Sequence, residues 1–369
     1  MNTYLKKFLI FLTLGILFLL IFNISPDKSF EEIAPKYAAS PSSFIEVKGI
    51  KIHYRDQGQG YPIVLIHGTG ASLHTWDAWT KELIKTYRVI RLDLPAYGLT
   101  GKDPQKRYSS IDYVNLLDAF LDKLGIEKFH LGGNSLGGLV SWLYASYHDQ
   151  KVNKLLLLNP SGFPFDSTPM VIKLAKTPIL NFFIRYITPK SFVKKNLKEV
   201  YYNDDLISNE TIDRYYDLTL FEGNREAFID RSFIERENYT DRLSLIQSPA
   251  LVLWGENDEW IPVEDSEKFK AHLSDDNKNL NFKILNTGIK ADFKFDKTNE
   301  LNSMSGSSKI NILNNYLRFI FALKNNQIEI TKANLKNKDL SISFDSFIKF
   351  NPFFEINSNI YIKKVDKKL

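Results

Sequence analysis

Apolar residues follow two strand-like patterns along the middle of the chain. In residues 50–55, apolar and polar residues alternate, which predicts a strand with one buried face. Residues 63–66 are a continuous apolar run, as is typical of a strand covered on both faces of a parallel sheet. Further strand-like runs lie within residues 88–95, 129–135, 154–160, 249–262 and 281–286.

Helical periodicity occurs between these runs. Apolar residues recur at helical spacing in residues 111–126, and residues 136–148 and 263–274 are also expected to be helices. Strands that alternate with helices predict an α/β fold with a mostly parallel sheet.

Two regions depart from this alternation. Residues from about 162 to 246 have helical character and many aromatic residues, which predicts a helical cap inserted over the sheet. Residues 289–369 alternate strictly, as in Ser341-Ile342-Ser343-Phe344, and are rich in Asn, Lys and Ser. That pattern predicts a C-terminal β-rich segment of antiparallel strands, unrelated in character to the body over residues 44–288.

The N-terminus predicts a membrane anchor over residues 1–25. Lys6 and Lys7 precede an apolar run from Phe8 to Ile24, and no small-residue cleavage site follows it, which favours an uncleaved anchor over a signal peptide. Residues 26–43 contain three prolines and predict a linker. We therefore expect a single span in a bacterial inner membrane, with the body in the periplasm.

Charge and cysteine content narrow the function classes. Residues 289–369 carry 14 Lys/Arg and 8 Asp/Glu, a net +6, so the chain's net charge of +5 comes from the tail. These lysines are scattered rather than arranged in a basic stripe, which argues against nucleic-acid binding. The chain has no cysteine, which excludes disulfides, thiolate metal sites and a cysteine nucleophile. No metal or organic cofactor is expected.

The strongest chemical motif is Gly133-Asn134-Ser135-Leu136-Gly137, which fits G-x-S-x-G between a strand and a helix. Such a turn forces the serine into a strained backbone conformation and exposes its hydroxyl. The following helix N-terminus presents free N–H groups that stabilise an oxyanion. Ser135 is therefore the candidate nucleophile.

Two further motifs complete the candidate site. After the 63–66 strand, a Gly-rich turn allows the Thr69 N–H, with that of Leu136, to form an oxyanion hole. His67 in this turn is interpreted as a structural histidine. After the 249–255 strand, Asp258 is the candidate acid, and its alternative role is a loop aspartate in an Asx turn.

With these motifs, residues 45–288 resemble the α/β-hydrolase family, in particular its bacterial membrane-anchored serine hydrolases. The resemblance implies a Ser–Asp–His triad in that chain order, a helical cap, and hydrolysis of esters, thioesters, amides or activated C–C bonds. A serine nucleophile argues against dehalogenases and epoxide hydrolases. One small departure is Ala96, where the family usually has Gly.

The large departure is the missing catalytic histidine. The family places it after a glycine that follows the last strand, but Ile289 follows Gly288 in the sequence L-N-T-G-I. The six histidines of the chain all precede this point, and each is expected to be a packing or surface residue: His53 facing outward on a strand, His67, His74, His130, His148 at a helix end, and His272 in a charged helix. Without a base the serine hydroxyl stays protonated and is a poor nucleophile.

Three interpretations remain open. The chain is a hydrolase, esterase-like by family, joined near residue 288 to an unrelated segment, and its activity is impaired. Alternatively, it is a pseudoenzyme that binds a ligand without turnover, or an envelope scaffold that pairs with a partner through its β-rich tail. The aromatic cap favours a small apolar or aromatic acyl substrate. The sequence leaves the substrate's identity, any protein partner and the oligomeric state open.

Overall fold

The computed structural model describes residues 24–164, 169–235 and 237–273, and then seven strands between residues 281 and 365. The predicted anchor therefore lies almost wholly outside the described residues, as does the sequence Thr287-Gly288. Among the described residues, no helix is both long and apolar enough to span a membrane.

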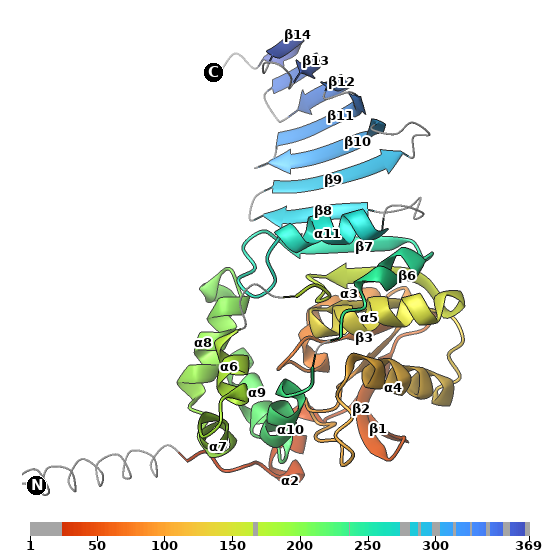
Figure 1. The fold of residues 1–369 in the computed structure, drawn as a ribbon. Coiled ribbons are helices and arrows are strands. Elements are labelled where there is room, and N and C mark those ends of the chain that lie inside the picture. Colours follow the sequence, from red (N-terminus) through yellow and green to blue (C-terminus); the bar gives the residue numbers. More distant parts are fainter. Residues whose placement is uncertain are drawn as a thin grey trace, which may run out of the picture.

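The body is built on a mostly parallel sheet, as predicted (Figure 1). Its strand order is β1-β2-β4-β3-β5-β6-β7-β8. Strands β4, β3, β5, β6, β7 and β8 run parallel, and β1 and β2 are antiparallel additions at one edge. The strands are β1 (Ser42–Val47), β2 (Ile50–Gln57), β3 (Tyr61–Ile66), β4 (Tyr87–Leu92), β5 (Phe129–Asn134), β6 (Val152–Leu158), β7 (Ala250–Gly255) and β8 (Asn281–Asn286).

Helices cover both faces of this sheet. On one face, α4 (Ser110–Lys123), α5 (Leu136–Tyr147) and α11 (Glu264–Leu273) enclose the main core, in which Phe120, Trp142 and Phe269 are fully buried. On the other face, α3 (Asp77–Leu83) covers a smaller cluster around Leu65 and Trp76. Burial from both sides explains the continuous apolar run in β3.

The predicted cap is a group of short helices over residues 170–232 (Figure 1, green). Its helices are α6 (Met170–Lys176), α7 (Leu180–Tyr186), α8 (Lys190–Val200), α9 (Asn209–Thr219) and α10 (Asn224–Ser232). It lies beside the body at the carboxyl ends of the parallel strands, where the candidate site residues follow their strands.

The segment predicted as a linker is packed against the cap. It contains α2 (Phe30–Tyr37), which begins with a capping box between Ser29 and Glu32. The carboxylate of Asp217 in α9 accepts hydrogen bonds from Lys28, at 2.6 Å, and from the Tyr37 hydroxyl, at 2.8 Å. These contacts fasten the N-terminal segment to the cap.

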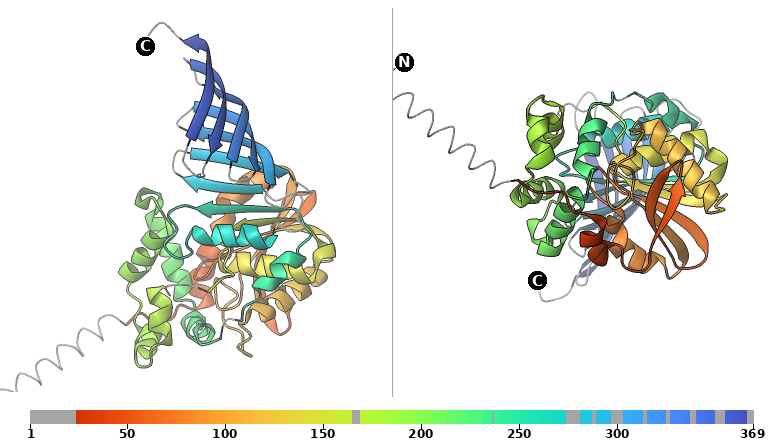
Figure 2. Two further views of the ribbon diagram at one scale, coloured as in Figure 1. Left: turned by 45° about the horizontal axis from the view of Figure 1, so that its top comes forward. Right: turned by 90° about the horizontal axis from the view of Figure 1, so that it is seen from below.

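The tail continues the same sheet with antiparallel strands (Figures 1 and 2, blue). Strand β9 pairs with β8 and starts at Ile289, opposite Asn286, and each later strand pairs with the one before it. The strands are β9 (Ile289–Asp296), β10 (Ser303–Ile312), β11 (Asn315–Lys324), β12 (Gln327–Lys336), β13 (Leu340–Lys349) and β14 (Glu355–Val365). Antiparallel pairing confirms the fold expected from the strict alternation.

Candidate active site

Ser135 sits in a sharp turn between β5 and α5. Its φ of 52° and ψ of −113° lie in a region that non-glycine residues rarely adopt. Flanking glycines make this turn possible. A Cβ on Gly133 would lie 2.1 Å from the Gly137 carbonyl oxygen, and one on Gly137 would lie 2.2 Å from that of Ile66. Both positions therefore require glycine, as the motif predicts.

The loop after β3 comes into close contact with this turn. A Cβ on Gly68 would lie 2.8 Å from Asn134 Oδ1 and 3.2 Å from Ser135 Cβ. The next residue, Thr69, is therefore close to the serine, and Leu136 supplies the first N–H of α5. Neither amide has a hydrogen-bond acceptor in the described part of the chain. Both stay available to an oxygen bound beside Ser135.

His67 holds this loop in place. Its ring is fully buried, with Nδ1 2.7 Å from the Gly68 carbonyl oxygen, and Nε2 accepts a hydrogen bond from the Leu94 N–H at 3.0 Å. Burial lowers the pKa of His67, so the ring stays neutral. Because one ring nitrogen has a partner in the turn and the other a partner after β4, His67 links the two segments, consistent with a structural role.

Asp258 follows β7 and is held by three hydrogen bonds. Its Oδ1 accepts the N–H groups of Trp260 and Ile261, each at 2.8 Å, and its Oδ2 accepts from the Asn159 side chain. The first two bonds form the Asx-type turn considered as an alternative. A carboxylate offers about four acceptor positions, so one remains for an imidazole N–H.

Asn159 links the two halves of the site, and the motifs do not reveal it. Its side chain also accepts the Gly255 N–H at 3.2 Å, and its backbone has φ 42°. The neighbouring residue Leu158 accepts the Ser135 N–H at 3.0 Å. A polar residue at the carboxyl end of the buried β6 run is the sequence signal that could have identified it.

The chain after β8 turns directly into another strand. Ser135 follows β5 and Asp258 follows β7, so the loop after β8 opens at the same edge of the sheet. There β9 begins at Ile289, with only two residues between it and the end of β8 at Asn286. Among the described residues, no histidine makes a hydrogen bond or ion pair with Ser135 or Asp258. The position at which the family places its base therefore follows the carboxyl end of β8, but the residue there is Ile289.

The outward orientation expected for His53 is wrong. Its side chain is fully buried, with Nδ1 2.7 Å from Asp93 Oδ2 and Nε2 2.9 Å from the Ser42 hydroxyl. The alternation in β2 fails here because Phe44 of β1 stacks on the imidazole ring and covers the outer face. Asp93 also accepts the N–H of Leu73, so this network anchors the loop that carries Thr69.

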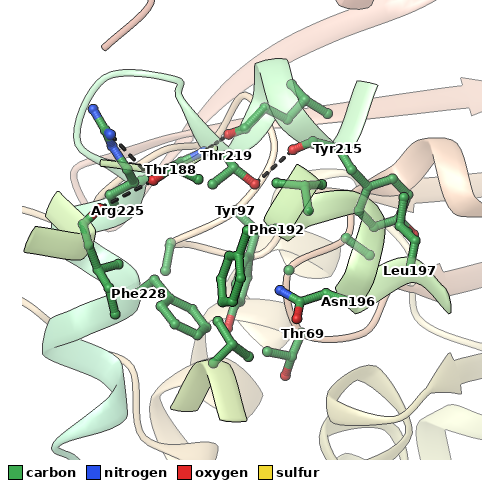
Figure 3. A pocket seen from close by; sticks show the side chains of 18 of the residues that line it. Thr69, Tyr97, Thr188, Phe192, Asn196, Leu197, Tyr215, Thr219, Arg225 and Phe228 are labelled. Carbon is green, nitrogen blue, oxygen red and sulfur yellow. Dashed lines mark hydrogen bonds between the residues drawn. The ribbon is translucent and has the colours of Figure 1, made fainter. Parts of the chain in front are cut away.

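A cavity of about 150 Å³ lies between this edge of the sheet and the cap (Figure 3). Thr69 and Trp260 contribute to its wall from the body, and α7, α8, α9 and α10 from the cap. Phe192, Leu197 and Phe228 make much of the wall apolar. Within the described ranges, no cluster of His, Asp or Glu could hold a metal ion.

Comparison with known proteins identifies the family. A model of the α/β-hydrolase fold matches residues 61–288, more than half of the chain. The chain belongs to the α/β-hydrolase fold family. The match to the family model ends at residue 288, so the tail from Ile289 onward lies outside the matched region.

Individual relatives are hydrolases. An uncharacterized hydrolase of Bacillus subtilis is 29% identical over 243 residues, covering 64% of this chain and 88% of that protein. A 2-hydroxy-6-oxononadienedioate/2-hydroxy-6-oxononatrienedioate hydrolase of Comamonas testosteroni is 27% identical, covering 64% and 87%. The crystal structure of a meta-cleavage product hydrolase from Pseudomonas fluorescens superposes with a TM-score of 0.56 at 24% identity, covering 66% of this chain and 88% of that one, and shows the same fold.

Proposed function

We propose that this hydrolase acts on an ester or related acyl bond through Ser135, and that its turnover is impaired because Ile289 stands where the base is needed. In this proposal the Ser135 oxygen attacks the acyl carbon and gives up its proton to water, and the amides of Thr69 and Leu136 stabilise the oxyanion formed from the carbonyl oxygen. Collapse of this intermediate expels the protonated alcohol, and a second water then releases the acid from Ser135. Asp258 is the acid that would orient a histidine. The observation that carries the proposal is the sharp turn at Ser135, with φ 52°, in a chain whose last parallel strand is followed by isoleucine rather than histidine.

The missing base sets the size of the expected defect. A positioned general base contributes roughly 10²–10⁴-fold to such reactions. Oxyanion stabilisation and substrate binding persist without it, so residual activity above the uncatalysed reaction is expected. The two free amides and the anchored Asp258 support a site that retains these remaining parts.

The cavity, whose wall comes near the Ser135 turn through Thr69, supports a small apolar or aromatic acyl group as the bound portion of the substrate. Its volume of about 150 Å³ matches the size of cavities that accommodate a benzene ring. Asn196 and Thr69 are among the polar side chains of the wall, which also include Thr188, Thr219 and Arg225. Such groups could orient a carbonyl or carboxyl group of the substrate.

A second candidate is binding without turnover. Asp258 already has three hydrogen-bond donors of its own, so the acid is satisfied without an imidazole. A pseudoenzyme of this kind would keep the cavity and lose only the chemistry.

Labelling with a fluorophosphonate probe tests the nucleophile directly. We expect slow labelling of the full chain, no labelling of Ser135→Ala, and unchanged labelling of Ser141→Ala. Ser141 is a matched control because it lies in the same helix, where its hydroxyl bonds the Gly137 carbonyl oxygen. Labelling that survives Ser135→Ala would disprove the assigned nucleophile.

Restoring an imidazole tests the assigned cause of the defect. We expect Ile289→His to raise the labelling rate by at least about tenfold, since a base contributes 10²–10⁴-fold when well placed. Ile289→Gln, which is polar but not basic, should leave the rate unchanged. Rapid ester hydrolysis by the unaltered chain would mean that another group already serves as the base.

A further inference from the structure

Helix α7 has an apolar surface on both sides. Ile184 and Ile187, at its C-terminal end, line the cavity. On its outer side, Ile179 and Phe182 are 74% and 61% exposed. Ile179 has φ 70°, a conformation that β-branched residues rarely adopt, so the chain accepts strain where this side chain projects into solvent.

We call the exposed apolar residues on and beside α7 the cap patch and define it as Ile24, Ile179, Leu180, Phe182 and Tyr186. The rings of Phe182 and Tyr186 are in edge contact, with centroids 5.2 Å apart. Ile24 lies beside them because the next N–H, that of Ser25, donates to the Tyr186 carbonyl oxygen at 2.8 Å. Clustered exposed apolar side chains of this kind mark a site of contact with another apolar surface.

The position of Ile24 indicates which surface that is. Ile24 ends the apolar run that starts at Phe8 in the sequence, so this run joins the body at the cap patch. Figure 1 shows the segment after Ile24 passing beside α7. A bilayer that receives the apolar run would therefore lie next to the patch.

Basic residues lie on the α6 side of the cap patch, while Asp27, Glu222 and Glu226 lie near Ile24 and Tyr186. Residues 169–200 contain seven Lys/Arg and one Asp/Glu. Lys173 and Lys176 of α6, the helix packed against α7, have no ion-pair partner among the described residues. Basic side chains beside an aromatic patch match the anionic surface of a bilayer, where aromatic rings and lysines are favoured.

We propose that the cap patch docks on an anionic lipid bilayer. Phe182 and Tyr186 enter the interfacial region, while Lys173 and Lys176 contact lipid phosphates. The site that docks is the outer face of the same helix whose inner residues line the cavity, so only the thickness of one helix, about 10–12 Å, separates lipid from cavity. The N-terminal run alone would tether the body but leave its orientation free.

This placement also suggests a substrate class, a conclusion that rests on the proposed function. A cavity with apolar walls beside a bilayer surface fits the acyl group of a membrane-derived ester better than a freely soluble polar acid. The docking itself requires no catalysis and is tested without it.

Site-specific fluorescence tests the docking, because the native chain has no cysteine to interfere. The full chain is reconstituted into phosphatidylglycerol-containing vesicles with an environment-sensitive fluorophore on Leu180→Cys. The matched control carries it on Lys128→Cys, an exposed position before β5 at the opposite edge of the sheet. We expect a blue shift and several-fold stronger quenching by headgroup-proximal nitroxide lipids at position 180 than at 128.

One variant and one change of lipid make the result decisive. Adding Phe182→Asp to Leu180→Cys should reduce quenching to the level at position 128, with the circular dichroism spectrum unchanged because Phe182 is exposed. Replacing phosphatidylglycerol with phosphatidylcholine should weaken quenching, because the zwitterionic surface attracts Lys173 and Lys176 less. Equal quenching at positions 180 and 128 would overturn the proposal, and would leave the labelling test of Ser135 unaffected.

Discussion

Strand β3 of the body and strand β11 of the tail belong to the same hydrogen-bonded sheet but bury their side chains differently. In β3, Val64, Leu65 and Ile66 are fully buried because helices cover both faces. In β11, residues alternate between exposed and partly buried, and Phe321 is among the few apolar tail side chains that are described as buried. Continuous strand pairing is therefore compatible with two different sources of stability: side-chain packing in the body and cross-strand contacts in the tail.

The largest difference in stability cost between the two regions is expected when one aromatic ring is removed from each. Phe120→Ala in the body, where the ring is fully buried, should reduce the free energy of unfolding by about 3–5 kcal/mol. Tyr361→Ala in the tail, where the ring is 60% exposed, should change it by less than about 0.5 kcal/mol. Urea unfolding followed by far-UV circular dichroism measures both, because the five tryptophans all lie in the body and would not report on the tail. Similar costs would contradict the contrast in packing.

Acid should weaken the body through His74. Burial lowers the pKa of His74 to about 4, despite the neighbouring Asp93. The unfolded state, with a pKa near 6.5, then binds a proton that the folded state does not, so stability falls as pH drops from about 6.5 to about 4.

We expect a loss of roughly 1–3 kcal/mol between pH 7 and pH 4, which His74→Gln should reduce. Urea midpoints at the two pH values give the measurement. The tail contains no histidine, so strand loss there should show no such dependence in this pH range. A pH profile unchanged by the substitution would mean that other groups dominate.

A smaller difference in stability cost is expected when one carboxylate in each region is replaced by an amide. Asp217→Asn weakens the bonds to Lys28, Lys36 and Tyr37 at a buried site, and should cost about 1–2 kcal/mol. Asp345→Asn in the tail affects an exposed acceptor of the Lys332 N–H and should cost less than about 0.5 kcal/mol. Differential scanning calorimetry compares them. Equal shifts would show that the N-terminal segment adds little to the cap.

Local patterns in the sequence were sufficient to predict the body. Continuous apolar runs such as residues 63–66 gave the buried strands, because a strand covered on both faces tolerates few polar residues. The glycines around Ser135 gave the sharp turn, since close backbone contacts leave no room for a Cβ. The positions of Thr69, Leu136 and Asp258 as functional groups stay predictions.

Features that depend on distant contacts were not predictable. His53 alternates as an outward residue but is buried by Phe44, and this cover comes from the preceding strand. Asn159 carries no motif, and its role arises only because β6 and β7 are neighbours. The change in composition and hydrophobic alternation at residue 289 predicts a separate segment. It does not reveal that β9 pairs with β8.

The short connection between β8 and β9 affects both the size of the sheet and the proposed active site. A long loop after β8 could carry a proton acceptor to Ser135. A short turn instead brings the chain back as a strand that pairs with β8, the last parallel strand. Only two residues separate the strands, so the chain after β8 extends the sheet. Growth of the sheet and the placement of a base beside Ser135, as proposed above, thus draw on the same few residues.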